Sequence, residues 1–206
     1  MDYFKIQVNH DNYRNIFFMK NKKMDITSNI DNLAIHPVKI DLFSYNLENE
    51  KNGDLIASIT GYYFDMEFME NEGISLFPIF DGDSQEFYEL YEALFENDDY
   101  RDELEVINEN LFYLSDIYVY EEYRQEGYFT MLVNQLEEIL KYVVKLNVGV
   151  IATRIYDFET IDQIDNIELL SEQEKENLKK KLTNVFIDND YNILEHDNHY
   201  LVKVLY

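Results

Sequence analysis

The most constraining feature of the sequence is a run of four patterns between residues 111 and 155: strand, polar turn, amphipathic helix and strand. Leu111 to Tyr120 is rich in aromatic and β-branched residues, which favour a strand. Apolar residues then recur at helical spacing from Gly127 to about Leu146. Val148 to Ile155 is almost continuously apolar, as is typical of a strand buried on both faces. This order predicts a βαβ crossover unit whose two strands are parallel.

Alternating apolar residues predict antiparallel strands around this unit. Phe4 to Val8 alternates and is expected to form a hairpin with the apolar stretch from Ile16 to Met19. Val38 to Leu42 alternates again, and Asp54 to Phe68 is a longer strand pattern with Gly61 inside it as a bulge or bend. Shorter strands are expected near the end of the chain, at residues 185–187, 193–195 and 200–206.

Two pairs of residues spaced like capping boxes predict two further helices. Asp83 precedes Glu86 by three residues, and Ser171 precedes Glu174 in the same way. In each case the side chain of the first residue caps the helix, and the acid three positions later hydrogen-bonds back to it. The predicted helices cover about residues 84–96 and 171–182.

The turn from Tyr120 to Phe129 is the best candidate for a ligand site. In an open sheet, ligands tend to bind where strand ends lead into a crossover helix. N–H groups at a helix start point outward and can receive a pyrophosphate, and a glycine such as Gly127 lets phosphates approach the main chain. The alternative is that Arg124 and Gly127 simply begin a helix after a polar loop.

This segment resembles the GNAT N-acetyltransferase family, whose hallmark is a strand followed by Arg or Gln, two residues, Gly, one residue and Gly or Ala. The strand Leu114 to Val119, Arg124 and Gly127 match it, and Phe129 departs from the small residue at the last position. In element order the resemblance runs from about residue 54 to 206. It implies that the strand parts from its neighbour to admit acetyl-coenzyme A. The implied coenzyme-binding residues are Ile117, Tyr118 and Val119 for pantetheine, and Arg124, Gln125, Glu126, Gly127, Tyr128, Phe129 and Thr130 for the pyrophosphate.

Acetyl transfer to an amine needs a base for the amine and an acid for the departing thiolate. Asp116, on the predicted central strand, is the candidate base, and a hydrogen-bonded structural aspartate is the alternative. The resemblance implies an acidic tyrosine near the end of the last helix, where Phe186 stands and cannot donate a proton. Tyr191 is therefore the candidate acid, with Tyr156 as a substitute, although either could be an ordinary core or rim residue.

Charge restricts the class of partner. The chain has 42 acidic and 17 basic residues, for a net charge of −25, so its surface repels nucleic acids and anionic membranes. The same charge favours a cationic acceptor such as a polyamine, an aminoglycoside or a lysine-rich protein. Glu121, Glu122 and Glu126 oppose coenzyme binding, because they would stand close to a polyanion with only Arg124 nearby in sequence.

Several other site classes are disfavoured. The absence of cysteine excludes disulfides and thiol chemistry and is compatible with a reducing cytoplasm. No apolar run reaches the ~18 residues of a membrane span, so we expect a soluble cytoplasmic protein. His196 and His199 are expected to flank a hairpin turn with no third ligand, so no metal site is predicted.

The sequence therefore predicts one α/β domain: a mixed, mostly antiparallel sheet with one parallel βαβ unit and helices on both faces. Residues 1–50 would be a β-rich extension and residues 51–206 an acyl-coenzyme A-binding core. The predicted function is transfer of an acetyl group from acetyl-coenzyme A to an amine of a cationic small molecule or basic protein. The alternative is a non-catalytic acidic interaction protein on the same fold, including a DNA mimic that occupies a basic surface.

Overall fold

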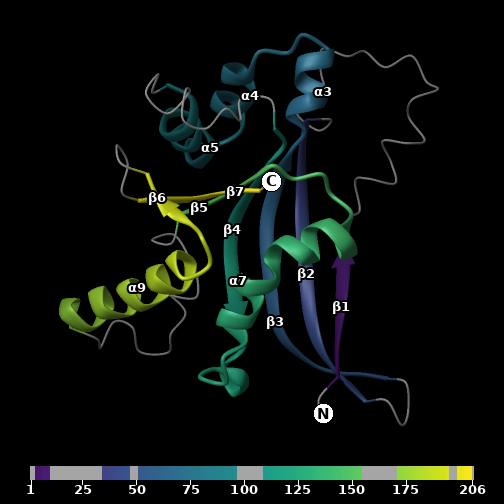
Figure 1. Cartoon of the computed structure of the whole chain (residues 1–206), viewed down its shortest axis with the longest axis vertical. Helices are drawn as coiled ribbons and strands as arrows, with labels where there is room; N and C mark the ends of the chain where they lie inside the picture. The colour runs from purple at the N-terminus through teal and green to yellow at the C-terminus, as the bar shows by residue number, and fades with distance from the viewer. Residues whose placement is uncertain are drawn as a thin grey trace.

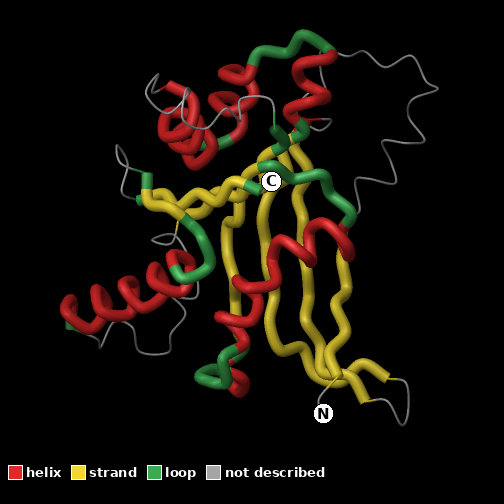
Figure 2. The backbone as a smooth tube through the Cα atoms, viewed as in Figure 1, coloured by secondary structure: helices red, strands yellow, loops and turns green. Residues whose placement is uncertain are grey.

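The structure, a computed structural model, describes residues 3–9, 34–46, 51–96, 109–154, 171–194 and 199–205. A seven-stranded sheet with the order β1-β2-β3-β4-β5-β7-β6 forms its centre (Figures 1 and 2). Every neighbouring pair is antiparallel except β4 and β5, which are parallel, so the predicted mixed sheet with one βαβ unit is confirmed. The strands are β1 Tyr3–Asn9, β2 Ile35–Asn46, β3 Lys51–Phe64, β4 Leu111–Val119, β5 Val150–Arg154, β6 Asn192–Ile193 and β7 Tyr200–Val204.

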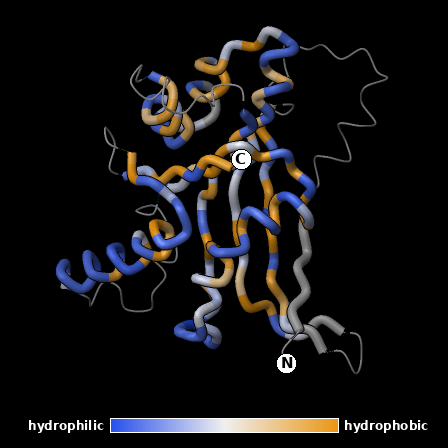
Figure 3. Tube along the Cα trace, viewed as in Figure 1, coloured by the Kyte–Doolittle hydropathy of each residue, from blue (hydrophilic) through white to orange (hydrophobic). Residues whose placement is uncertain are grey.

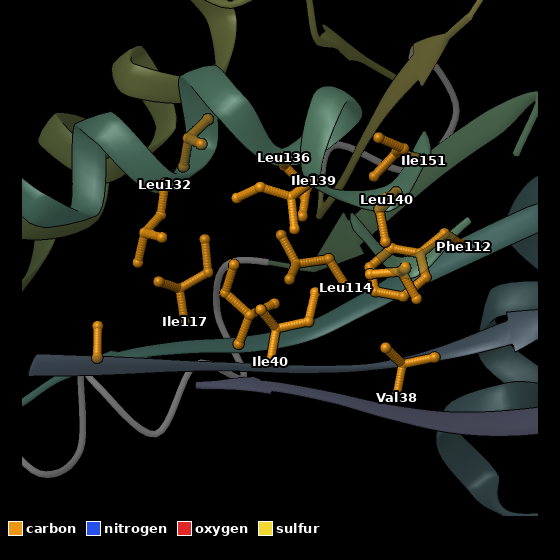
Figure 4. Close-up of a cluster of buried hydrophobic side chains, with 14 of the residues drawn as sticks. Val38, Ile40, Phe112, Leu114, Ile117, Leu132, Leu136, Ile139, Leu140 and Ile151 are labelled. Atoms are coloured by element: carbon orange, nitrogen blue, oxygen red, sulfur yellow. The ribbon is translucent and has the colours of Figure 1, made fainter. Parts of the chain in front are cut away.

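Helices cover both faces of the sheet, as predicted. Alternate side chains of β4 enter different hydrophobic clusters: Phe112 and Leu114 pack under α7, η4 and α9, whereas Leu111 and Tyr113 pack under α3, α4, α5 and η2. Figure 4 shows the first cluster, with side chains of the α7 side meeting those of β2 and β4. The helices are α3 Met66–Asn71, α4 Leu76–Asp83, α5 Gln85–Tyr91, η2 Glu92–Glu96, η3 Glu121–Tyr123, α7 Tyr128–Glu138, η4 Ile139–Val144 and α9 Glu172–Ile187; η2 and η4 are π-helical, and η3 is a 3₁₀ turn.

The first strands extend the sheet from β3. β1 pairs with β2, and β2 pairs with β3, so they lie in the same sheet as the βαβ unit. The expected hairpin partner of β1, Ile16 to Met19, lies outside the described residues, and so does the expected turn at Asp197 and Asn198. The strand predicted from Asp54 to Phe68 is too long at its C-terminal end. The Asp65 carboxylate accepts a hydrogen bond of 2.9 Å from the Phe68 N–H and begins α3.

The predicted helix starts are correct for α9 and displaced by one residue for α5. The capping box of Ser171 and Glu174 forms as expected. At α5 the cap is Ser84, whose hydroxyl accepts from the Phe87 N–H at 3.2 Å, while Asp83 ends the preceding helix. A serine hydroxyl serves as well as a carboxylate in this role.

The predicted strand at residues 185–187 is wrong, because α9 continues to Ile187. Phe186 is fully buried in the cluster under α7, and Val185 packs against that cluster. Burial of this helical face therefore outweighs the strand preference of the β-branched residues.

Candidate functional site

The strands β4 and β5 separate after only four paired positions. Their parallel ladder runs from Leu111 opposite Val150 to Leu114 opposite Thr153, where the Thr153 hydroxyl donates to the Leu114 carbonyl at 2.9 Å. β4 then continues to Val119, while β5 ends at Arg154. In Figure 1, β4 continues down the view and β5 turns to the left with β7. The resemblance implied a separation at this place.

A β-bulge in β4 lies at the point of separation. Gly61 of β3 pairs with Leu114, and the preceding Thr60 pairs with Asp116, so Ser115 is an extra residue on β4. The bulge or bend predicted at Gly61 is confirmed. A Cβ on Gly61 would lie 2.5 Å from the Tyr113 carbonyl oxygen, so the close approach of the two strands requires glycine here.

The bulge changes which β4 side chains point to which face. Before it, Phe112 and Leu114 enter the cluster under α7, and after it Ile117 and Val119 do so. Uninterrupted alternation would have placed Asp116 in that cluster instead. The bulge therefore keeps Ile117 buried and directs Asp116 to the opposite face, where it lines a cavity.

On the α7 face, a cavity of about 770 Å³, here called the turn cavity, lies between the β4–α7 turn and α9. Its walls combine main-chain and polar groups of the turn with apolar side chains of α9. The lining residues are Val119, Glu121, Tyr123, Arg124, Gln125, Gly127, Tyr128, Phe129, Thr130, Leu178, Lys181, Leu182 and Val185.

Most of the predicted coenzyme-binding residues line the turn cavity, but three do not. Glu126 is exposed and outside the lining, Ile117 is fully buried in the cluster under α7, and Tyr118 lines the cavity on the opposite face. A main-chain role for Ile117 and Tyr118 stays a prediction.

The turn has the backbone geometry of an open helix start. Gln125 and Gly127 both have left-handed conformations, with φ of 65° and 87°. Gly127 precedes α7 without a side-chain cap, and the first hydrogen bond of the helix runs from the Met131 N–H to the Gly127 carbonyl at 3.0 Å. A Cβ on Gly127 would meet nothing within 4 Å, so the main chain is accessible there. Amides of such a first turn point out of the helix end, where an anion can accept from them.

The side chain of Arg124 contacts the end of β4 and so stabilises the turn. Its Nε donates to the Val119 carbonyl at 3.0 Å, and its guanidinium lies 5.8 Å from the centre of the Tyr118 ring. Arg124 also lines the turn cavity, so its positive charge stays at the cavity wall.

Sequence reasoning missed the contribution of α9, above all Lys181. Of the three glutamates that oppose an anion, only Glu121 lines the turn cavity, and two cationic residues, Arg124 and Lys181, line it as well. The helical spacing of Leu178, Lys181 and Val185 marks one face of α9, but the sequence does not indicate that this face meets the turn. Figure 3 shows α9 largely hydrophilic, with hydrophobic residues towards its end at the sheet.

On the opposite face of the sheet lies a second cavity of about 740 Å³, here called the polar cavity. Lys39, Thr60 and Asp116 stand side by side on β2, β3 and β4, and Ser58 is opposite Tyr118 in the next row. Asp116 is only 9% exposed although it lines this cavity. The full lining is Lys39, Ser58, Thr60, Glu86, Glu89, Ser115, Asp116, Tyr118, Tyr120 and Arg154.

Both cationic side chains that line the polar cavity, those of Lys39 and Arg154, form ion pairs. Arg154 of β5 forms an ion pair with Glu89 of α5. Gln85 also donates to Glu89 at 3.1 Å, and this hydrogen bond, followed by the Arg154 guanidinium, lowers the pKa of the Glu89 carboxyl. Lys39 lies 3.6 Å from Asp41, a buried carboxylate that also accepts from the Ser58 hydroxyl at 2.7 Å.

Tyr191, the candidate acid, lies in the hydrophobic core. It is 2% exposed, its ring packs edge-on against Phe186 with 5.0 Å between centroids, and it lines neither cavity. Burial raises the pKa of its hydroxyl, which has no hydrogen-bond partner among the described residues. Its catalytic role stays a prediction that this placement disfavours. Tyr156 and His196 lie outside the described residues.

Two other kinds of feature are absent from the residues that the structure describes. No three His, Asp or Glu side chains gather there in a way that could hold a metal ion. None of the helices described there combines the length and apolar character needed to cross a bilayer.

Comparison with known proteins does not assign the chain to a family. No family model matches the chain, and no curated protein matches it. Among solved structures the chain is similar to the crystal structure of a point mutant of KacT. That similarity has 9% sequence identity and a TM-score of 0.42, and it covers 97% of this chain and 95% of the other. The fold assignment therefore rests on the sheet topology described above.

Proposed function

We propose that this protein is a GNAT-type N-acyltransferase that moves an acetyl group from acetyl-coenzyme A to an amine of a cationic acceptor. The observation that carries the proposal is the separation of β4 from β5 between two cavities, one on each face of the sheet. The exposed turn before α7 suits the anionic coenzyme, and the polar cavity suits an amine.

The turn cavity offers complementary groups along the coenzyme. Main-chain amides from Gln125 to Thr130 would receive the pyrophosphate at the start of α7. Arg124 and Lys181 would offset its charge. The apolar wall formed by Val119, Leu178 and Leu182 would pack against pantetheine, and the thioester would reach the gap between β4 and β5.

The polar cavity offers the groups for the transfer itself. The amine nitrogen forms a bond to the thioester carbonyl carbon, the carbon–sulfur bond breaks, and Asp116 takes the proton that the amine loses. The thiolate then needs a proton. Tyr118 and Tyr120 line this cavity and are therefore better placed than the buried Tyr191 to supply it.

A second candidate, an acidic interaction protein without catalysis, is favoured by the segment between β3 and β4. From residue 65 to 96 it contains ten acidic residues and no Lys, Arg or His. Such a lobe, here called the acidic lobe, would attract the basic surface of another protein. Its acids are Asp65, Glu67, Glu70, Glu72, Asp81, Asp83, Glu86, Glu89, Glu92 and Glu96.

Calorimetric titration with acetyl-coenzyme A tests the proposal. Gly127→Asp places a carboxylate at the expected pyrophosphate position and should weaken binding by at least about tenfold, a cost of about 1.4 kcal/mol. Gly127→Ala is the matched control, because it shares the backbone strain at φ of 87° without adding charge. Its affinity should stay close to that of the wild type.

Two neighbouring lysines of α9 provide a second matched pair. Lys181 lines the turn cavity, whereas Lys180 is exposed and outside the lining. Lys181→Glu should weaken coenzyme binding by about tenfold, and Lys180→Glu much less. Equal losses would indicate diffuse attraction to the surface rather than a site.

Catalysis is tested by thiol release from acetyl-coenzyme A with amine acceptors. Asp116→Asn should reduce the rate by about a hundredfold while leaving coenzyme affinity unchanged. Absence of coenzyme binding by the wild type would refute the acyltransferase. Binding without thiol release across a panel of amines would favour the interaction protein.

A further inference from the structure

Aromatic side chains gather between α4 and α5, and one of their rings is open to solvent. Phe77 of α4 is 41% exposed, and its ring meets those of Tyr88 and Tyr91 of α5 edge-on, with 6.3 and 5.6 Å between centroids. Tyr91 also packs against Phe95 of η2 at 5.7 Å. These four side chains are here called the aromatic patch. In Figure 1, α4 and α5 lie at the top of the view, beyond the end of β4.

Helical spacing brings the rings of α5 and η2 together. Tyr88, Tyr91 and Phe95 follow one another at intervals of three and four residues, which places them along one side of the helix. Phe87 and Leu90 of α5 are the residues that fill the core. Exposed aromatic surface is unfavourable in water, and a contiguous patch of it is typical of a protein interaction site. The aromatic patch therefore suits a partner that covers Phe77.

Carboxylates surround the aromatic patch. The Tyr88 hydroxyl donates to Glu92 at 2.7 Å, and this hydrogen bond, together with the charges of Glu92, Glu96 and Asp81, raises the pKa of Tyr88 to about 12. None of these three acids forms an ion pair within the described ranges of the chain. The acidic lobe that holds them has no basic residue of its own. A partner must therefore supply the positive charge.

The aromatic patch lies outside both cavities. None of its four residues lines the polar cavity or the turn cavity, and neither do Asp81, Glu92 and Glu96. The side chains of α5 that line the polar cavity are Glu86 and Glu89. Binding at the aromatic patch therefore does not depend on the proposed acetyl transfer.

We infer that the aromatic patch docks a basic amphipathic segment of another protein, whose apolar side chains cover Phe77 and whose arginines or lysines pair with the surrounding carboxylates. Arginine suits this surface best, because its guanidinium pairs with carboxylates and also stacks on tyrosine rings. The acids repel nucleic acid and anionic membranes, and a second copy of this chain would bring another net charge of −25. A small cation would leave Phe77 uncovered.

Fluorescence anisotropy of the full chain with two labelled synthetic peptides tests the inference. Both peptides contain only leucine and arginine in equal composition. In the first, leucine recurs at helical spacing and forms one face; in the second, the order is scrambled. At neutral pH and about 0.15 M salt, where diffuse attraction is screened, the wild type should bind the first peptide about tenfold more tightly than the second.

Two matched pairs of variants locate the binding. Phe77→Ser should weaken binding of the first peptide about tenfold, whereas Tyr142→Ser, at a residue of η4 that is 66% exposed, should leave it unchanged. Glu92→Gln keeps an acceptor for Tyr88 but removes the charge, and it should weaken binding about threefold. Glu67→Gln, at an exposed position of α3 in the same lobe, should weaken it less.

The inference would be overturned if the wild type showed no preference for the first peptide, or if the two members of either pair of variants lost equal affinity. A separate titration with acetyl-coenzyme A keeps the docking surface and the acyltransferase distinct. Peptide binding that depends on Phe77, without coenzyme binding, would leave the docking surface standing and remove the acyltransferase. Coenzyme binding without the peptide preference would do the reverse.

Discussion

Gly61 of β3 shows how a single residue affects which side chains the neighbouring strand β4 directs to each face of the sheet. It stands opposite the bulge that moves Asp116 out of the core and into the polar cavity. A Cβ there would lie 2.6 Å from the Phe112 ring and 2.5 Å from the Tyr113 carbonyl oxygen, and both neighbours are buried. The strands can approach this closely only with glycine.

Gly61→Ala should therefore destabilise the protein by about 2–3 kcal/mol, since the core must shift to admit the methyl group. Urea denaturation measures this loss. Gly73→Ala is the control, because a Cβ at Gly73 meets nothing within 4 Å and only its φ of 66° imposes strain, about 1 kcal/mol. A cost for Gly61→Ala no larger than that of the control would contradict the packing argument.

Residues with local roles were predictable from the sequence, and residues with long-range roles were not. Glycine inside a strand pattern indicates a bulge, which identified Gly61. A polar turn before an amphipathic helix indicates a helix start, which identified Arg124 and Gly127. Lys181 was missed, because its place in the turn cavity depends on how α9 docks against a turn more than fifty residues earlier.

At the scale of elements, one end of α9 depends on local sequence and the other on long-range packing. Its start was predicted from Ser171 and Glu174, whose reciprocal hydrogen bonds need only four residues. Its end was predicted too early, because burial of Phe186 in the cluster under α7 extends the helix. The pairing of β1 with β2 was not predicted either, since the sequence suggested a partner closer in the chain.

The cap of α9 gives a prediction with a pH dependence. The Ser171 hydroxyl donates to the Glu174 carboxylate at 2.7 Å and the Ser171 N–H at 2.8 Å, and both hydrogen bonds lower the pKa of Glu174 below its usual 4.5. A carboxyl with a depressed pKa in the folded state stabilises the fold above its unfolded pKa. This stabilisation is lost as the pH falls through the folded pKa.

Ser171→Ala should cost about 1 kcal/mol at neutral pH, because the Glu174 N–H loses its hydroxyl acceptor. It should also reduce the loss of stability on acidification below pH 4.5, since one of the two hydrogen bonds that shift the Glu174 pKa is removed. Thermal unfolding of both proteins across this pH range measures the difference. Parallel stability curves would contradict the role assigned to the cap.

At the scale of the whole molecule, charge is distributed unevenly. The acidic lobe carries ten of the 42 acidic residues and no basic residue, and it borders the polar cavity through Glu86 and Glu89. Across the sheet, Arg124 and Lys181 face the turn cavity. The net charge of −25 predicts a cationic partner from composition alone, but composition cannot indicate on which face of the sheet Arg124 and Lys181 lie.

The central claim is that the turn cavity binds an acyl-coenzyme A. Backbone amide NMR spectra recorded during titration with acetyl-coenzyme A test it most directly, because every N–H of the turn reports on its own position. The claim predicts saturable shifts for Gln125 to Thr130 and for Leu178 to Val185 of α9, with β1 and β2 largely unaffected. Unchanged spectra at millimolar ligand, or shifts confined to other surfaces, would contradict it.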